Sequence, residues 1–187
     1  MPQEPLPSPA PRAAPAAEAP PAAATPDASK RARYAAIVGG VLAVDIVTKV
    51  IVQNTLQEYR PVPVLGEFFR LTYIFNPGAA FGLHLGDASR WIFMGLALLA
   101  VVVLGIFYRN TPAHDRWRLN AIALVTGGAI GNLIDRIREP RGVIDFFDFG
   151  FGALRWPVFN VADIAVTVGA VLLAVSLWRE DQRREQG

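Results

Sequence analysis

The chain has 187 residues, enough for one compact unit, and 52% of them are hydrophobic while 18% are charged. It contains no cysteine, which excludes a disulfide framework and a thiol nucleophile. The net charge of +2 does not indicate a nucleic-acid partner, because the basic residues flank apolar segments, where they can contact anionic lipid. This composition predicts an integral membrane protein.

The first 33 residues are rich in proline and alanine and lack a periodic apolar face. This composition predicts that residues 1–33 form a disordered cytoplasmic tail. Basic residues precede the first apolar run, which has no convincing cleavage site, so we expect an uncleaved span rather than a secretory signal peptide. A polar cytoplasmic tail over residues 179–187 leaves residues 34–178 as the membrane domain.

Four apolar segments have the length of a membrane span. Residues 91–108 form the clearest, because they carry no charge and would cross most of a hydrocarbon core. Polar residues interrupt the other three, residues 34–52, 119–137 and 158–178. All four tryptophans fall at expected span ends, where amphipathic rings favour the headgroup region. The predicted fold class is therefore membrane all-α, a four-transmembrane-helix bundle.

The basic residues set the expected orientation. They are dense before the first span, in the second loop and after the fourth span, which places both termini in the cytoplasm. Arginines between the third and fourth spans weaken this pattern, but parity requires the first and third loops to share a side. The polar residues of the spans then gather in the outer half of the membrane, as expected for an active site that opens outward.

The two outer loops carry sequence signals of their own. Residues 62–65 and 68–75 of the first loop are rich in β-branched and aromatic side chains, which predicts a small extracytoplasmic β element. The turn at residues 76–82 could form one wall of a substrate groove, although an ordinary surface hairpin explains it equally well. The third loop places Asp145 and Asp148 among aromatic residues, and strand, short helix and flap all remain open there.

Two of the apolar segments share a polar signature, Asn-x-x-Asp. Asn132 and Asp135 lie in the third segment, Asn160 and Asp163 in the fourth, and each pair would share a helix face. A carboxylate inside a membrane span costs roughly 2.5–3.5 kcal/mol by insertion scales, so such residues tend to mark function. The repeated signature predicts a paired acid and base.

Small residues would let these carboxylates meet. The glycines at positions 127, 128 and 131 allow a neighbouring helix to approach closely. Two carboxylates a few Å apart share one proton, so one can accept a proton from an attacking water while the other supports the peptide carbonyl. A helix–helix hydrogen bond, a silent scaffold and a proton relay in a small carrier or channel subunit remain alternatives.

Other charged residues have structural explanations as well. Asp45 and Lys49 are one helical turn apart, which favours an intrahelical ion pair over direct catalysis. Arg136 is expected to pair with Asp145, to reach a lipid phosphate or to snorkel.

Metal and serine chemistry are both disfavoured. His84 and His114 are expected on opposite sides of the membrane, and the sequence has no HExxH motif. No serine has a suitably placed lysine or histidine. We therefore expect neither a metal nor an organic cofactor.

In five sequence blocks that occur in the same order, the chain resembles the lipoprotein signal peptidase family, also called signal peptidase II. The members of this family are bacterial membrane aspartyl proteases. The blocks are DIVTK from Asp45, NPGAAFG from Asn76, GGAIGNLIDR ending at Arg136, VIDF ending at Phe146, and FNVADIAVTVG from Phe159. They cover roughly residues 34–178. This resemblance implies that Asp135 and Asp163 are catalytic. It implies supporting or substrate-contacting roles for Asp45, Lys49, Asn76, Gly78, Asn132, Arg136, Asp145 and Asn160.

The resemblance also implies a reaction and a location. The family cleaves a signal peptide immediately before a cysteine whose thiol bears diacylglycerol, so the implied partners are diacylglyceryl-modified prolipoproteins and membrane lipid. Such a lipid would hold the scissile bond at membrane depth, in the outer leaflet of the bacterial cytoplasmic (inner) membrane. We expect a monomer. Val166 stands where the family pattern has isoleucine, and the tail before Lys30 lies outside that pattern.

Overall fold

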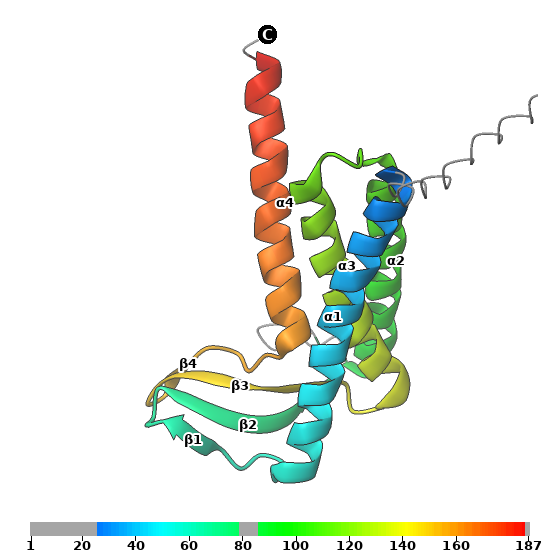
Figure 1. Ribbon diagram of the computed structural model, residues 1–187. Coiled ribbons are helices and arrows are strands. Elements are labelled where there is room, and N and C mark those ends of the chain that lie inside the picture. Colours follow the sequence, from blue (N-terminus) through cyan, green and yellow to red (C-terminus); the bar gives the residue numbers. More distant parts are fainter. Residues whose placement is uncertain (1–25, 79–85, 186–187) are drawn as a thin grey trace, which may run out of the picture.

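The computed structural model describes residues 26–78 and 86–185. Four helices stand side by side, and a small sheet lies across one end of them (Figure 1). The helices are α1 (Pro26–Thr55), α2 (Ser89–Asn110), α3 (Arg116–Arg138) and α4 (Val161–Glu185), with a short 3-10 turn at Gly86–Ala88. The strands are β1 (Val62–Leu65), β2 (Phe69–Asn76), β3 (Val143–Phe151) and β4 (Leu154–Arg155).

Three of the described helices are long and apolar enough to cross a membrane. The qualifying segments are Asp27–Thr55 in α1, Ser89–Asn110 in α2 and Val161–Gln182 in α4. α3 does not share this apolar character, and it packs against each of the other three helices. Because its neighbours enclose it, α3 can carry polar residues that would be costly against lipid. A fourth span therefore stays a prediction.

Close helix contacts depend on two glycines of α3. A Cβ on Gly128 would lie 2.3 Å from the carbonyl oxygen of Ala162, and one on Gly131 would lie 2.7 Å from the carboxylate of Asp45. Real Cβ atoms essentially never come so close, so a larger residue at position 128 would push α3 away from the α4 backbone, and one at position 131 would displace the Asp45 carboxylate of α1. The close helix approach predicted from these glycines is confirmed.

Two helices extend beyond the segments predicted from apolar residues. α1 begins at Pro26, so the expected tail boundary at residue 33 falls inside a helix, and residues 1–25 lie outside the described chain. The extension is anchored, because Lys30 donates a 2.7 Å hydrogen bond to the Thr111 carbonyl and lies 4.6 Å from the Tyr108 ring centroid. α4 likewise continues past residue 178 to Glu185.

The sheet is antiparallel, in the order β1-β2-β3-β4. β1 and β2 confirm the strands predicted in the first loop. β3 and β4 come from the third loop, whose conformation the sequence left open, and β3 pairs with β2 from Asn76–Val143 to Phe69–Phe149. A buried apolar cluster joins the sheet to the end of α1; it contains Val52, Tyr73, Phe75, Ile144 and Phe146. This sheet therefore brings two loops distant in sequence to one end of the helices.

Candidate active site

α4 begins with a reciprocal pair of hydrogen bonds between Asn160 and Asp163. The backbone N–H of Asp163 donates to Asn160 Oδ1 at 2.9 Å, and the backbone N–H of Asn160 donates to Asp163 Oδ2 at 3.1 Å. This is a capping box, in which side chains satisfy amides that have no partner within the helix. Asn160 therefore precedes α4 rather than lying inside a span that starts near residue 158, as the sequence predicted. Asp163 is fixed in the first turn.

Asn160 also joins three parts of the fold. Its side chain is completely buried, and Nδ2 lies within hydrogen-bond distance of Asn132 Oδ1 (3.0 Å) and Asp145 Oδ1 (2.7 Å). It also reaches the Ile144 carbonyl at 3.2 Å. Through this one amide, the start of α4 is tied to α3 and to β3.

The second carboxylate, Asp135, lies in the last turn of α3. Its Oδ2 is 2.7 Å from the ammonium of Lys49 and accepts a 3.2 Å hydrogen bond from the backbone N–H of Ile144. Lys49 is 3% exposed and also contacts Asp45 at 2.8 Å, so the ion pair predicted within α1 is present. The sequence did not predict the contact with Asp135, because helical spacing reports neighbours within one helix and says nothing of which helices meet.

The two carboxylates are connected through the polar side chains between them. Asn132 Nδ2 donates to Asp163 Oδ1 at 2.8 Å, and Lys49 lies 3.4 Å from Asn132 Oδ1. The structure therefore brings both Asn-x-x-Asp pairs into one network. On the far side, Asp45 is 1% exposed and accepts a 3.0 Å hydrogen bond from the backbone N–H of Ala162, which satisfies a second amide at the start of α4.

Arg136 forms a different set of contacts from those predicted. Its side chain is buried, and it donates to the backbone carbonyls of Gly78 (2.9 Å) and Asn132 (3.1 Å). Among the described residues it neither pairs directly with Asp145 nor snorkels to the surface, so those two expectations are wrong. The reason is geometric: the turn at Gly78 folds back over α3 and offers a carbonyl to the guanidinium.

Asn76 connects that turn to β3. Its Nδ2 donates to Asp145 Oδ2 at 2.9 Å, and its Oδ1 accepts from the backbone N–H of Gly78 at 3.0 Å. Burial, helped by the nearby charge of Asp163, raises the pKa of Asp145 to about 7, although amide hydrogen bonds from Asn76 and Asn160 oppose the shift. The remainder of the predicted turn, residues 79–82, lies outside the described chain.

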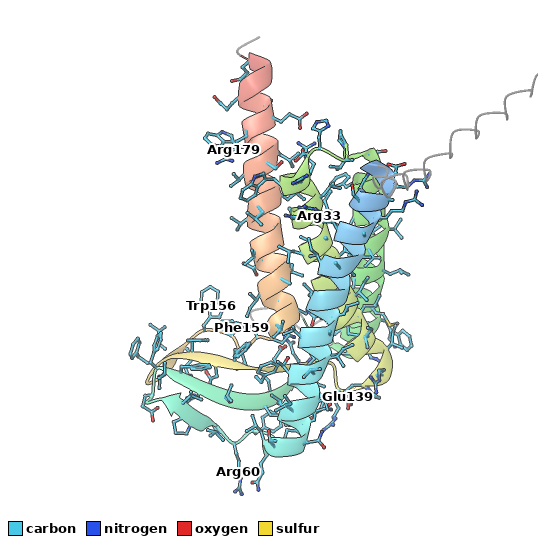
Figure 2. The ribbon with its side chains drawn as sticks, in the orientation of Figure 1. Arg33, Arg60, Glu139, Trp156, Phe159 and Arg179 are labelled. Atoms are coloured by element: carbon cyan, nitrogen blue, oxygen red, sulfur yellow. The ribbon has the colours of Figure 1, made fainter. Side chains whose placement is uncertain are left out.

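A cavity of about 430 Å³ opens beside this network. Asn132, Arg136, Asp145 and Asp163 line its polar side, and the segment from Trp156 to Phe159 lines its apolar side. Trp156 and Phe159 lie between the sheet and the start of α4 (Figure 2). Asp135 is not on the cavity wall, and its side chain is 12% exposed. A chain bound here would meet a carboxylate on one side and apolar surface on the other.

The described residues offer no candidate metal centre, because no three histidine, cysteine, aspartate or glutamate side chains gather there in a way that could hold an ion. His114 lies at the opposite end of the helices, between α2 and α3. His84 falls outside the described residues.

Comparisons with known proteins agree with this geometry. A family model described as signal peptidase (SPase) II matches residues 37–179. The chain belongs to the signal peptidase II family. It is therefore a membrane hydrolase of the aspartic peptidase class. Because three of its helices can cross a membrane, it is a multi-pass protein of the inner membrane.

Individual relatives match most of the chain. A lipoprotein signal peptidase from Geobacter sulfurreducens is 40% identical over 153 residues, which cover 81% of this chain and 94% of the relative. Another from Burkholderia mallei is 44% identical over 135 residues, 71% of this chain and 80% of the relative. A solved bacterial membrane enzyme superposes with a TM-score of 0.73 at 27% identity, covering 81% of this chain and 91% of that one.

Proposed function

We propose that this peptidase removes signal peptides from diacylglyceryl-modified prolipoproteins by cutting immediately before the lipidated cysteine, with Asp135 and Asp163 as the catalytic pair. The observation that carries the assignment is the position of Asp163. It lines a cavity with one apolar wall and is connected through Asn132 and Lys49 to the second carboxylate. The family and its lipoprotein signal peptidase members support the same substrate.

The chemistry is general acid–base hydrolysis. One ionised carboxylate accepts a proton from a water molecule as the water oxygen attacks the scissile carbonyl carbon. The partner, in its protonated form, donates a hydrogen bond to the carbonyl oxygen as negative charge develops there. Collapse of the tetrahedral intermediate breaks the C–N bond, and the proton taken from water passes to the leaving nitrogen. No covalent enzyme intermediate is needed.

The supporting residues are assigned by their contacts. Asn132 and Asn160 orient Asp163, Lys49 and Asp45 position Asp135, and Arg136 and Asn76 hold the turn at Gly78 against the site. Asp145 holds the side-chain amides of Asn76 and Asn160 in place. Asp45, Lys49 and Asn160 therefore act through neighbours, and pre-organisation of this kind is what keeps reacting groups in register. Asn76, Asn132, Arg136 and Asp145 also line the cavity, where they can contact the substrate.

We infer that the site lies at the level where a substrate lipid would hold its cysteine. Asp135 is in the last turn of α3 and Asp163 in the first turn of α4, so both carboxylates lie near the sheet end of the helices. α2 has 22 residues and spans about 33 Å at 1.5 Å per residue, close to the thickness of a hydrocarbon core of about 30 Å. An acyl chain could therefore stay in lipid while the peptide enters the cavity.

The orientation that fits these features has four spans, with both termini in the cytoplasm and the sheet outside. Arg33 and Arg179 lie at the end of the helices away from the sheet (Figure 2). All four tryptophans are 60–65% exposed, as expected for side chains in the headgroup region. The active site then faces the outer leaflet, and a single chain supplies every residue of the network.

A cleavage assay with purified protein in detergent tests the assignment. The substrates are a diacylglyceryl-modified prolipoprotein and its unlipidated form, and products are separated by gel shift. Asp135→Asn and Asp163→Asn should each abolish cleavage of the lipidated substrate, and the unlipidated form should not be cut. Asp115→Asn is the matched control, because Asp115 caps α3 at the opposite end and asparagine caps a helix equally well.

Either of two results would contradict the proposal. Cleavage that survives both aspartate changes would remove the assigned pair. Equal cleavage of the two substrates by the wild-type protein would remove the lipid requirement.

A further inference from the structure

A second cavity lies at the end of the helices opposite the active site. Its volume is about 760 Å³, within the range of roughly 300–1,000 Å³ usual for small-molecule sites. It runs between the start of α3 and the last turns of α4, and we call it the α3–α4 groove. Residues that line it include His114, Arg116, Arg118, Leu172, Val175 and Arg179.

The groove has a basic rim and an apolar wall. Three arginines face two acidic residues, Asp115 and Glu180, so one net positive charge remains before His114 is considered. Both acids pair with Arg118, at 3.4 Å for Asp115 and by a close contact for Glu180. Arg118 is therefore held in place, and it neutralises part of the acidic charge.

Arg116 and Arg179 are the two cations available for a ligand. Both side chains are exposed, and in the part of the chain that the structure describes neither forms an ion pair. They approach the groove from different helices, Arg116 from the first residue of α3 and Arg179 from the last turns of α4. Two guanidinium groups from different helices that line one groove are suited to binding one anion, since arginine matches the geometry of phosphate oxygens.

The surroundings of the groove are those of a membrane surface. Trp117 also lines it, is 65% exposed and adjoins Arg116, while Trp178 is 63% exposed and adjoins Arg179. Leu172 and Val175 continue the groove along α4 toward the middle of the helix, where the surface is apolar and exposed at Val168 and Val171. A ligand that fits needs an anionic head at the arginines and hydrocarbon along α4.

We propose that the α3–α4 groove binds an anionic phospholipid, with its phosphodiester between Arg116 and Arg179 and an acyl chain along Leu172 and Val175. Nothing in the proposed cleavage reaction uses this site, which lies at the opposite end of the helices. In the proposed orientation the lipid belongs to the inner leaflet. The bound lipid would bridge α3 and α4 where Arg118 and Glu180 already join them.

Native mass spectrometry of delipidated protein tests the proposal. Phosphatidylglycerol and phosphatidylcholine are titrated separately, and the fraction of protein with one bound lipid is measured. Arg116→Gln/Arg179→Gln should weaken phosphatidylglycerol binding about thirtyfold, because each basic residue near the surface contributes about 1 kcal/mol. The matched control, Arg31→Gln/Arg109→Gln, removes the same charge from exposed arginines of α1 and α2.

A second variant separates the shape of the site from its charge. Val175→Trp fills the groove without altering an arginine, and it should weaken phosphatidylglycerol binding as well. Three results would overturn the proposal. The first is equal loss of binding in the two double variants, which would indicate diffuse surface charge. The second is wild-type binding that does not prefer phosphatidylglycerol. The third is lipid binding that millimolar inorganic phosphate displaces, which would indicate an anion site and no lipid site.

Discussion

Asn132 donates a 2.8 Å hydrogen bond from its side-chain amide to Asp163, so α3 orients the carboxylate that α4 supplies. The same asparagine accepts from Asn160 through Oδ1 at 3.0 Å. One residue on the central helix therefore fixes both members of the α4 capping box. The effect of removing it follows directly from these contacts.

Asn132→Leu should lower kcat about 100-fold, because misplacement of a reacting group by about 1 Å costs this much. The helices should remain folded, since leucine has the same number and branching of side-chain heavy atoms as asparagine. Steady-state cleavage of the lipidated substrate measures the effect. Asn120→Leu is the control on the same helix, because Asn120 Oδ1 has no hydrogen-bond partner among the described residues. Equal losses in the two variants would argue against an orienting role for Asn132.

Lys49→Met should destabilise the protein by about 3–5 kcal/mol, because Asp45 and Asp135 would lose the cation that compensates their buried charge. Adding Asp45→Asn removes one of the two uncompensated charges and should recover part of that loss. Unfolding in detergent with increasing denaturant measures both changes. A double variant no more stable than Lys49→Met would contradict the charge argument.

Gly128→Ala should destabilise the protein by about 1–3 kcal/mol, the usual cost of overpacking. The added methyl group would collide with the Ala162 carbonyl and with Val166 Cγ2, which is 2.7 Å from the ideal position. Gly39→Ala is the matched control in α1, because nothing lies within 4 Å of its added Cβ. The control should keep or raise the thermal unfolding midpoint, since alanine favours a helix by up to about 1 kcal/mol.

The hydrogen bonds to Asp148 predict how the stability of the sheet depends on pH. Burial alone would raise the pKa of this carboxyl, but hydrogen bonds from Thr72, Arg155 and Arg70 outweigh burial and lower the pKa below its ordinary value. A lowered folded-state pKa stabilises the fold above the ordinary carboxyl value of about 3.9, and this stabilisation is lost as the pH falls through the folded-state pKa.

Asp148→Asn should therefore be less stable than wild type by about 1–3 kcal/mol at pH 7, because charged hydrogen bonds are lost. The difference should shrink below about pH 4, where the wild-type carboxylate becomes protonated. Thermal unfolding of both proteins at pH 7, 5 and 3 measures it. A gap that stays constant across this range would show that the charge of Asp148 is not responsible.

The sequence predicted the features that depend on residues close together in the chain. Long apolar runs located the helices, and β-branched residues at 62–65 located β1. The Asn-x-x-Asp pairs located the polar network, although their local structures differ. Asn132 and Asp135 lie inside α3, whereas Asn160 precedes α4 and caps it. The same four-residue pattern fits both, because neighbours at i and i+3 are close in a helix and in a cap.

The sequence alone did not predict contacts between segments that are distant in the chain. Lys49 and Asp135 meet only because glycines let α1 and α3 approach, and their spacing in the chain gives no indication of it. The third loop forms β3 because β2 offers an unpaired edge, and Asp145 then faces Asn76. The residues of the third loop did not predict a strand by themselves, since aromatic pairs such as Phe146 and Phe147 break the apolar–polar alternation of a strand.

The capping box at the start of α4 has a consequence for how this peptidase can change. Asp163 serves the helix and the reaction with the same two oxygens, so a substitution that removes both oxygens, such as Asp163→Ala, loses the acid and also frays the first turn. Such substitutions of Asp163 are expected to lower catalytic activity and protein stability together. Engineering of substrate range is therefore better directed at the apolar wall from Trp156 to Phe159, where side chains can change while the helix start stays intact.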